Sequence, residues 1–230
     1  MQATALITGG TGGLGSAVTK RFLSGGWRVV VPWFVPEELA RVAQHPRLEL
    51  VEADLFDPAS VARCVQAATS DPNEPLGAVV NLVGGFAAGG RVHQTPVEDF
   101  EAQLRLNLRP TYLVSQAAIP HLLDSGQGAI VCVSSRAAKQ PFSGAAGYVV
   151  AKAAVLAFVD ALAAEYGNDG IRVNAILPSI IDTPANRAAQ PGADTARWVR
   201  PDDIAETVHF LCSAEAGPIV GAHLPVYGRA

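Results

Sequence analysis

Short apolar runs alternate with longer mixed segments along the whole chain, and the apolar runs predict strands. Most of them are nearly unbroken stretches of Val, Ile, Leu and Ala, a pattern typical of strands buried on both faces of a parallel sheet. The mixed segments predict helices, the longest covering residues 96–123. Such alternation predicts an α/β fold, with one doubly wound parallel sheet of about seven strands and helices on both faces. The predicted strands cover residues 4–8, 28–31, 48–52, 78–85, 129–133, 171–177 and 222–226.

Length and charge narrow the class of protein. The 230 residues are enough for one α/β domain with a sizeable core and too few for two. The formal net charge is −4 and no Lys/Arg run occurs, so we expect no nucleic-acid partner. The chain starts without a secretory pattern, and no uncharged apolar window of about 20 residues predicts a membrane span. We expect a soluble cytoplasmic protein without a membrane partner.

The cysteines indicate neither a metal site nor disulfide bonds. Cys64, Cys132 and Cys212 are odd in number and widely spaced. Such spacing is unlike a metal-ligand set or a disulfide framework and is typical of a reducing compartment. We therefore expect no bound metal.

A glycine-rich stretch follows the first predicted strand and precedes a helical pattern. Residues 8–15 read Thr-Gly-Gly-Thr-Gly-Gly-Leu-Gly. In this context Gly9 makes a tight turn, while Gly13 and Gly15 allow close approach of backbone to a pyrophosphate and of helix to sheet. The N–H groups at the helix start then face the anion. A glycine-rich hairpin is the alternative, but the position after a first strand favours dinucleotide binding in a Rossmann-type domain.

The positions that usually read the adenosine half of a dinucleotide are less informative here. An acid that binds the ribose commonly ends the second strand. This chain has Pro-Trp-Phe at residues 32–34, neither acidic nor basic. Asp54, after the third strand, either caps its own turn or hydrogen-bonds adenine, and both interpretations stay open.

Tyr148 and Lys152 lie four residues apart in a helical pattern and therefore share one helix face. A positive charge beside a phenol favours phenolate and lowers the phenol pKa towards the working pH, as a general acid–base catalyst requires. The alternative is a half-buried tyrosine beside a surface lysine. The pair becomes catalytic only with further partners.

Pro110 lies inside the long helical segment and cannot donate a backbone hydrogen bond to the carbonyl of Leu106. We expect a kink beside Asn107, which would make this residue a polar group in the core. A surface asparagine on an ordinary helix is the alternative.

Taken together, these motifs resemble the short-chain dehydrogenase/reductase family over essentially the whole chain. Residues 8–15 resemble its glycine motif, and residues 81–84 resemble the end of its fourth strand. The chain departs from the family at residues 82–83, at Ser179 and at residues 32–33, and the last departure leaves NAD versus NADP open. The residues that match the family's catalytic tetrad are Asn107, Ser135, Tyr148 and Lys152.

The resemblance implies hydride transfer between a nicotinamide and a small-molecule carbonyl or alcohol. Tyr148 would be the general acid/base, Lys152 would also hold the nicotinamide ribose, and Ser135 would bind the substrate oxygen. Asn107 would anchor a water in a proton relay. The cofactor would be NAD or NADP with a shallow preference for NAD, because no cation lies in the expected slot. The resemblance also implies a homotetramer or homodimer.

The resemblance and the motifs together define the expected binding residues within one NAD(P)-binding domain spanning residues 1–230. Those expected at the substrate are Phe86, Arg136, Phe142 and Arg187. Those expected at the cofactor are Thr8, Gly9, Thr11, Gly13, Leu14, Gly15, Trp33, Asp54, Leu55, Asn81, Val83, Gly84, Tyr148, Lys152, Pro178, Ile181 and Thr183.

Residues 179–200 follow the sixth predicted strand and contain two prolines and a glycine after Thr183, which predicts an irregular lid over the substrate, anchored by Trp198. The lid also resembles that of quinonoid dihydropteridine reductases, an enzyme type that generally lacks the serine. Such a reductase is the alternative function. A non-catalytic cofactor-binding sensor is the interpretation we favour least, because both Tyr148 and Lys152 are present.

Overall fold

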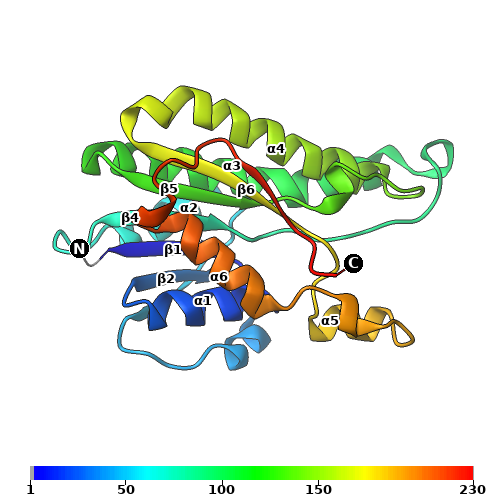
Figure 1. Cartoon of the computed structure of the whole chain (residues 1–230), viewed down its shortest axis with the longest axis horizontal. Helices are drawn as coiled ribbons and strands as arrows, with labels where there is room; N and C mark the ends of the chain where they lie inside the picture. The colour runs from blue at the N-terminus through cyan, green and yellow to red at the C-terminus, as the bar shows by residue number, and fades with distance from the viewer. Residues whose placement is uncertain (1–2, 230) are drawn as a thin grey trace.

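The computed structural model describes residues 3–229 and contains one seven-stranded sheet in the order β3-β2-β1-β4-β5-β6-β7. Every neighbouring pair of strands is parallel, as the alternating pattern predicts. Helices cover both faces (Figure 1). The strands are β1 (Thr4–Thr8), β2 (Arg28–Trp33), β3 (Leu48–Glu52), β4 (Leu76–Asn81), β5 (Gly128–Val133), β6 (Ile171–Pro178) and β7 (His223–Val226).

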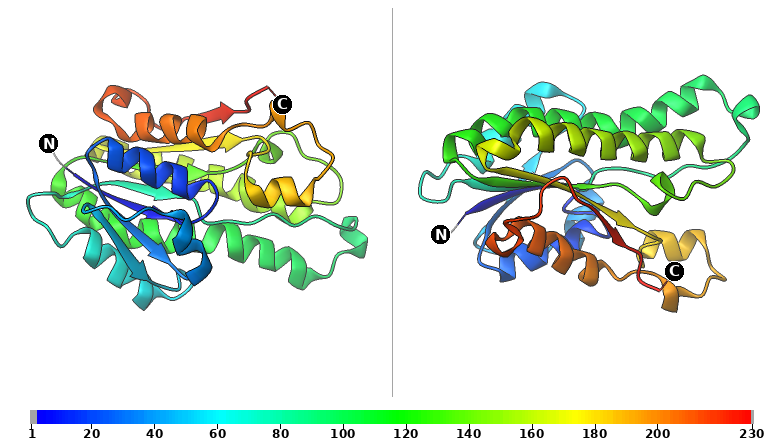
Figure 2. Two further views of the ribbon diagram at one scale, coloured as in Figure 1. Left: turned by 90° about the horizontal axis from the view of Figure 1, so that it is seen from below. Right: turned by 45° about the horizontal axis from the view of Figure 1, so that its top comes forward.

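The helices form two layers. One layer contains α1 and α6, and the other contains α2, α3 and α4, as the two turned views make plain (Figure 2). The predicted helix over residues 96–123 is α3, which continues through Pro110 and Pro120. The helices are α1 (Gly15–Ser24), α2 (Pro58–Ala68), α3 (Val97–Ser125), α4 (Ala146–Tyr166), α5 (Pro184–Ala189) and α6 (Pro201–Cys212).

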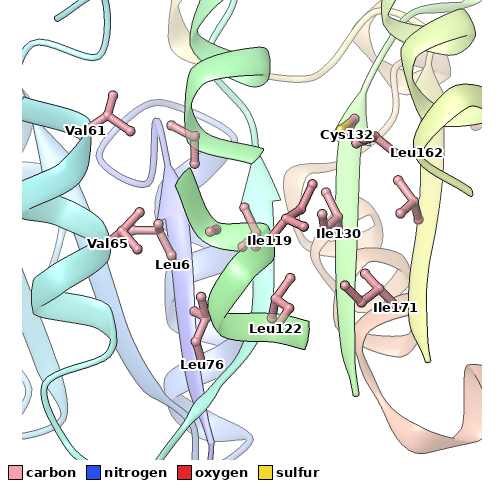
Figure 3. Close-up of a cluster of buried hydrophobic side chains, with 14 of the residues drawn as sticks. Leu6, Val61, Val65, Leu76, Ile119, Leu122, Ile130, Cys132, Leu162 and Ile171 are labelled. Atoms are coloured by element: carbon pink, nitrogen blue, oxygen red, sulfur yellow. The ribbon is translucent and has the colours of Figure 1, made fainter. Parts of the chain in front are cut away.

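Both faces of the sheet are apolar along its central strands, because alternate side chains of these strands enter different cores. In β1, Leu6 packs towards α2, α3 and α4, whereas Ala5 and Ile7 pack towards α1 and α6. Figure 3 shows the first of these cores, where Ile119 and Leu122 of α3 meet Ile130 of β5. This two-sided burial explains why the central strands are continuous apolar runs in the sequence, whereas the edge strand β3 alternates.

The order of the strands creates the binding crevice. After β3 the chain crosses back and β4 pairs with β1 on the side away from β2, with Thr8 opposite Asn81 at the carboxyl ends. Open α/β sheets bind ligands where the strand order reverses in this way. The glycine turn after β1 and the loop after β4 meet there, because a Cβ built on Gly9 would lie 3.3 Å from the backbone N of Val83.

The segment 179–200 is more regular than predicted. It contains the short helix α5, which begins with Pro184 directly after the N-cap Thr183, whose side chain accepts a hydrogen bond from the Asn186 N–H. Proline suits the first position of a helix, where its missing N–H costs nothing. Trp198 is buried, which agrees with its predicted role as an anchor. The expectation of an irregular segment is wrong for residues 184–189, where Pro184 starts a helix rather than breaking one, and it holds for most of the remaining residues.

Helix α4 bears on the expectation that no uncharged apolar window of about 20 residues predicts a membrane span, and it contains the charged residues Lys152 and Asp160. One stretch, residues 146–169, which includes α4, is long and apolar enough by length and composition alone. Helix α4 packs against α3 and β6, and Val155, Leu156, Val159 and Leu162 belong to the core. Its apolar character is that of a helix covering a sheet.

Candidate active site

The four predicted tetrad residues come from three parts of the chain. Asn107 lies on α3, Ser135 follows β5, and Tyr148 and Lys152 lie on α4. Ser135 and Tyr148 line one cavity of about 570 Å³, together with residues of the 179–200 segment. A larger cavity of about 680 Å³ lies between the loop after β4 and the starts of α3 and α4, and its lining includes none of the four. The smaller cavity is therefore the candidate reaction site.

Lys152 is held inside the protein. Its side chain is buried and its Nζ donates to the backbone oxygen of Val133 at 3.0 Å. Burial lowers the pKa of the Lys152 ammonium to about 8, and the Cys132 side chain opposes this shift. The Lys152 Nζ lies 5.9 Å from the centre of the Tyr148 ring. A cation thus lies behind the phenol, as the spacing of four residues predicts.

Tyr148 departs from expectation in its acidity. Burial raises the pKa of the Tyr148 phenol above its usual value, and the neighbouring Ser135 hydroxyl opposes this shift. We had expected the lysine to lower this pKa, which was wrong for the protein alone. Helical spacing predicts that two side chains are neighbours, but it does not show how far both are removed from water. The phenol is therefore protonated at neutral pH and able to donate.

Asn107 is buried and binds the loop after β4. Its Nδ2 donates to the backbone oxygens of Gly85 and Gln103, both at 3.0 Å, and its Oδ1 accepts from the Gly85 N–H at 3.1 Å. A Cβ built on Gly84 would lie 2.6 Å from the Asn107 Oδ1 and 3.0 Å from the Lys152 Nζ. Asn107 and Lys152 therefore approach each other around a position that only glycine fits. The interpretation as a surface asparagine is excluded.

Ser134, for which the sequence predicts no role, binds helix α4. Its buried hydroxyl donates to the backbone oxygen of Lys152 at 2.7 Å, whereas Ser135 Oγ accepts from the Ala137 N–H at 3.2 Å. The first serine joins the end of β5 to α4, and the second faces the cavity. Two adjacent serines at the end of a strand were the only signal in the sequence.

The glycine turn is shaped to receive a phosphate. Gly9 has a φ of 65°, and a Cβ on Gly15 would lie 1.9 Å from the Gly9 oxygen, so both positions require glycine. Helix α1 starts after Leu14 without a side-chain cap, which leaves its first N–H groups available to an anion. A Cβ on Gly13 would lie 3.1 Å from Thr183, so the glycine turn and the start of the predicted lid lie close together. These features fit a dinucleotide.

The polar residues beside the turn are partly engaged within the protein. Thr8 Oγ1 accepts from the Leu82 N–H at 3.1 Å, and Asn81 Nδ2 donates to Ser115 Oγ at 3.1 Å. The Asn81 Oδ1 is buried without a hydrogen-bond partner among the described residues. These contacts join β1, β4 and α3 beneath the crevice, and Val83 follows on the loop between them.

Two residues expected near the adenosine also make contacts within the protein. Asp54 Oδ1 accepts from the Phe56 N–H at 2.9 Å, so Asp54 caps its own turn, and its contact with adenine stays a prediction. Leu55 is buried in the core beside α2. Trp33 ends β2 and is half-buried. A charged residue that sequence reasoning missed lies nearby: Glu38 accepts a hydrogen bond from Thr11 of the glycine turn at 2.7 Å.

The predicted substrate residues divide into two groups. Phe86, Arg136 and Phe142 line the smaller cavity, and the Phe86 ring meets the Tyr148 ring edge-on at 5.0 Å. Arg187 does not line it. Its guanidinium binds the Asp182 carboxylate through two hydrogen bonds of 2.5 and 2.8 Å, which lowers the pKa of Asp182. The cation of the cavity is therefore Arg136.

Three residues expected at the cofactor lie at or just before the start of the predicted lid. Pro178 ends β6, and Ile181 lines the cavity and pairs with Val199 in an isolated bridge. The Thr183 hydroxyl caps α5, and its side chain faces Gly13. The structure thus brings the residues expected at the two ends of the cofactor site close together.

Comparisons with known proteins agree with this geometry. A family model described as enoyl-(acyl carrier protein) reductase matches residues 9–228. The chain is 33% identical to a 2-(R)-hydroxypropyl-CoM dehydrogenase of Xanthobacter autotrophicus, over 99% of this chain and 98% of the relative. It is 32% identical to a 3-ketoacyl-(acyl-carrier-protein) reductase from Brucella melitensis complexed with NADH, with a TM-score of 0.89 over 99% of this chain and 98% of that one.

A further solved structure, ElxO with NADP bound, has a TM-score of 0.91 at 24% identity, covering 99% of this chain and 98% of that one, and supports the fold. The fold and these relatives define an NAD(P)-dependent oxidoreductase. The chain belongs to the short-chain dehydrogenase/reductase family, which confirms the resemblance seen in the sequence.

Proposed function

We propose that the protein transfers a hydride between a nicotinamide and the carbon of a small-molecule carbonyl or alcohol, with Tyr148 as general acid/base. The bound nicotinamide would supply the hydride chemistry. One observation carries the proposal: Tyr148 and Ser135 line the same cavity, with the buried Lys152 ammonium behind the phenol. In the direction of reduction, the protonated phenol donates its proton to the substrate oxygen.

The remaining tetrad residues support this proton transfer. The Ser135 hydroxyl hydrogen-bonds the substrate oxygen, where charge develops in the transition state. Lys152 stabilises the phenolate that Tyr148 leaves behind and holds the nicotinamide ribose. Asn107 is a positioning residue: it fixes the loop at Gly84 and Gly85, beside the Lys152 ammonium. It would also anchor the relay water that the family resemblance implies.

The cofactor is held by the glycine turn on one side and by the base of the lid on the other. We propose NADH as the preferred cofactor, because residues 32–34 at the end of β2 offer no cation to a 2′-phosphate. The expected discrimination from this slot alone is shallow.

The substrate carries an anionic group in addition to its carbonyl. Arg136 lines the cavity, lies 5.7 Å above the Tyr227 ring and makes no ion pair with a described residue. The uncharged polar side chains of Gln140, Asn186 and Gln190 line the same cavity. A guanidinium without a carboxylate partner binds a carboxylate or sulfonate by charge-assisted hydrogen bonds.

A panel of carbonyl compounds with NADH and NADPH, followed at the nicotinamide absorbance, tests this function. We expect turnover of aldehydes or ketones that carry a carboxylate or sulfonate. Arg136→Ala should raise KM for them about tenfold or more, as the loss of a charge-assisted hydrogen bond implies. Arg187→Ala is the matched control and should leave KM unchanged. No turnover of any carbonyl or alcohol would contradict the proposal.

A quinonoid dihydropteridine reductase is not favoured, since Ser135 is present and faces the cavity. Including quinonoid dihydropterin in the panel separates the two, because the pteridine interpretation requires it to be reduced faster than simple ketones.

We further propose that the protein is cytoplasmic and assembles as a homotetramer or homodimer through α3 and α4. Tyr112 of α3 and Val150 of α4 are large apolar side chains that remain exposed in the single chain. Apolar side chains of this size on exposed helices are suited to contact a second copy. The mass in solution, measured by light scattering, tests the assembly.

A further inference from the structure

An acidic side chain lies at the glycine turn although the end of β2 has none. Residues 36–41 form the 3₁₀ helix η1 (Pro36–Arg41) just beyond β2. From this helix Glu38 reaches back to the turn, where its Oε2 accepts a hydrogen bond of 2.7 Å from the buried Thr11 hydroxyl. The helix thus brings a carboxylate to the side of the turn next to β2.

The second oxygen of this carboxylate binds a cation. Glu38 Oε1 accepts from Arg41 Nη1 at 2.9 Å, and the Glu38 side chain remains 30% exposed. A carboxylate has about four acceptor sites in total, so these two donors leave capacity for further hydroxyl groups. Arg41 is itself 50% exposed and is held beside the turn by Glu38.

The place of this pair defines its ligand. In dinucleotide-binding sheets an acid between the glycine turn and the second strand accepts a hydrogen bond from the adenosine 2′-hydroxyl, whereas a cation there binds a 2′-phosphate. We propose that Glu38, with Arg41 as its counter-ion, is the residue by which this protein selects NADH over NADPH. This inference rests on the proposed function, since it concerns the same cofactor.

The physical basis is the charge that the cofactor carries at its ribose 2′ position, beside Glu38. The Glu38 carboxylate accepts from a ribose hydroxyl and repels a 2′-phosphate, which carries a charge of the same sign. The ionised Glu38 carboxylate also forms an ion pair with the Arg41 guanidinium, which is then less available to a phosphate. Without that carboxylate, Arg41 is free to bind the phosphate, as guanidinium groups do with particular strength. The discrimination should therefore be stronger than residues 32–34 alone predict.

A purely structural role for Glu38 makes a different prediction. If the carboxylate only tied η1 to the glycine turn, Glu38→Gln would keep an acceptor for Thr11 and leave the cofactor preference unchanged. The adjacent Glu37 supplies the matched control. It is exposed, and its side chain forms no hydrogen bond with a described residue.

Binding of NADH and of NADPH, measured by fluorescence titration without substrate, provides the test. We expect the wild type to bind NADH more tightly than NADPH. Glu38→Gln should lower the ratio of NADH affinity to NADPH affinity by about tenfold or more. The change should come mostly from tighter NADPH binding, because the variant lacks the negative charge that repels the 2′-phosphate. Glu37→Gln removes the same charge and should leave the ratio within about twofold, because its charge lies in solvent.

Arg41 tests the pair from the other side. Arg41→Ala should retain or increase the preference for NADH, and the double variant Glu38→Gln/Arg41→Ala should lose the gain in NADPH affinity. The fragments 2′,5′-ADP and 5′-ADP, which carry only the adenosine half, should reproduce the change. An unchanged ratio in Glu38→Gln, or fragments that do not follow the intact cofactors, would overturn the inference. Failure of the wild type to bind either nucleotide would instead overturn the proposed function.

Discussion

At the scale of single residues, the buried ammonium of Lys152 lowers the stability of the folded protein. Its ammonium is buried with one hydrogen bond, to the Val133 carbonyl, and burial lowers its pKa to about 8. A buried charge without a carboxylate partner opposes folding. Functional sites commonly carry such perturbed groups. The protein thus keeps the cation that the proposed chemistry needs, although burying this cation lowers the free energy of unfolding.

This cost gives a pH-dependent prediction for Lys152→Met. Below pH 8 the folded protein holds a buried charge that methionine lacks, so the variant should be more stable than the wild type. The unfolded chain keeps the lysine pKa near 10.5. Between these values the unfolded state binds more protons, so wild-type stability rises with pH. The difference in Tm should therefore shrink as the pH rises through 8 towards 10.5.

Thermal melts of both proteins without cofactor, at several pH values, measure this difference. Lys139→Met is the control, because Lys139 is exposed and the same charge is lost without burial. A gap in Tm that stays constant or grows between pH 7 and pH 10 would contradict the assignment of a buried, destabilising ammonium, since one lowered pKa requires it to shrink over about this range.

The sequence predicted which residues meet at the site more reliably than their electrostatic state. The spacing of Tyr148 and Lys152 fixed their proximity through helix geometry. The direction in which the Tyr148 pKa shifts depends on how deeply the phenol is buried, and the spacing of residues along the helix does not describe burial. Arg187 was expected at the substrate, whereas Asp182, five residues earlier, binds its guanidinium across the start of α5. Local pairing of that kind is invisible until the turn between the two is known.

At the scale of elements, α5 turns the predicted irregular lid into a short ordered one. Thr183 caps this helix and also faces Gly13 across the crevice. A dinucleotide between the glycine turn and the lid would contact both, so binding should order residues 179–200. The lid was predicted from its position after β6, whereas its helix required the capping role of Thr183 to be recognised.

Limited trypsin digestion tests this prediction at Arg187, which is exposed in the lid. NADH should slow cleavage after Arg187, because the ordered segment no longer opens to fit the protease. AMP, which carries only the adenosine half, should protect little. Equal rates of cleavage at this site with and without NADH would remove the lid proposal.

At the scale of the whole molecule, the strand order matters most. Alternating strands and helices predicted a parallel sheet, and buried runs predicted helices on both faces. The crossing from β3 to β4 beside β1 was not encoded in any local pattern, yet it places the glycine turn opposite the loop that carries Gly84. For the same reason Glu38 escaped notice: its contact with Thr11 joins residues that are neighbours only after the sheet has formed.

The central claim is that Tyr148 transfers the proton, and Tyr148→Phe tests it most directly. The exchange removes one hydroxyl and little volume. Turnover of the best substrate in the panel should fall by roughly 10²–10⁴-fold, the usual contribution of a general acid, while the Kd for NADH stays within about twofold. Near-normal kcat with intact NADH binding would contradict the account.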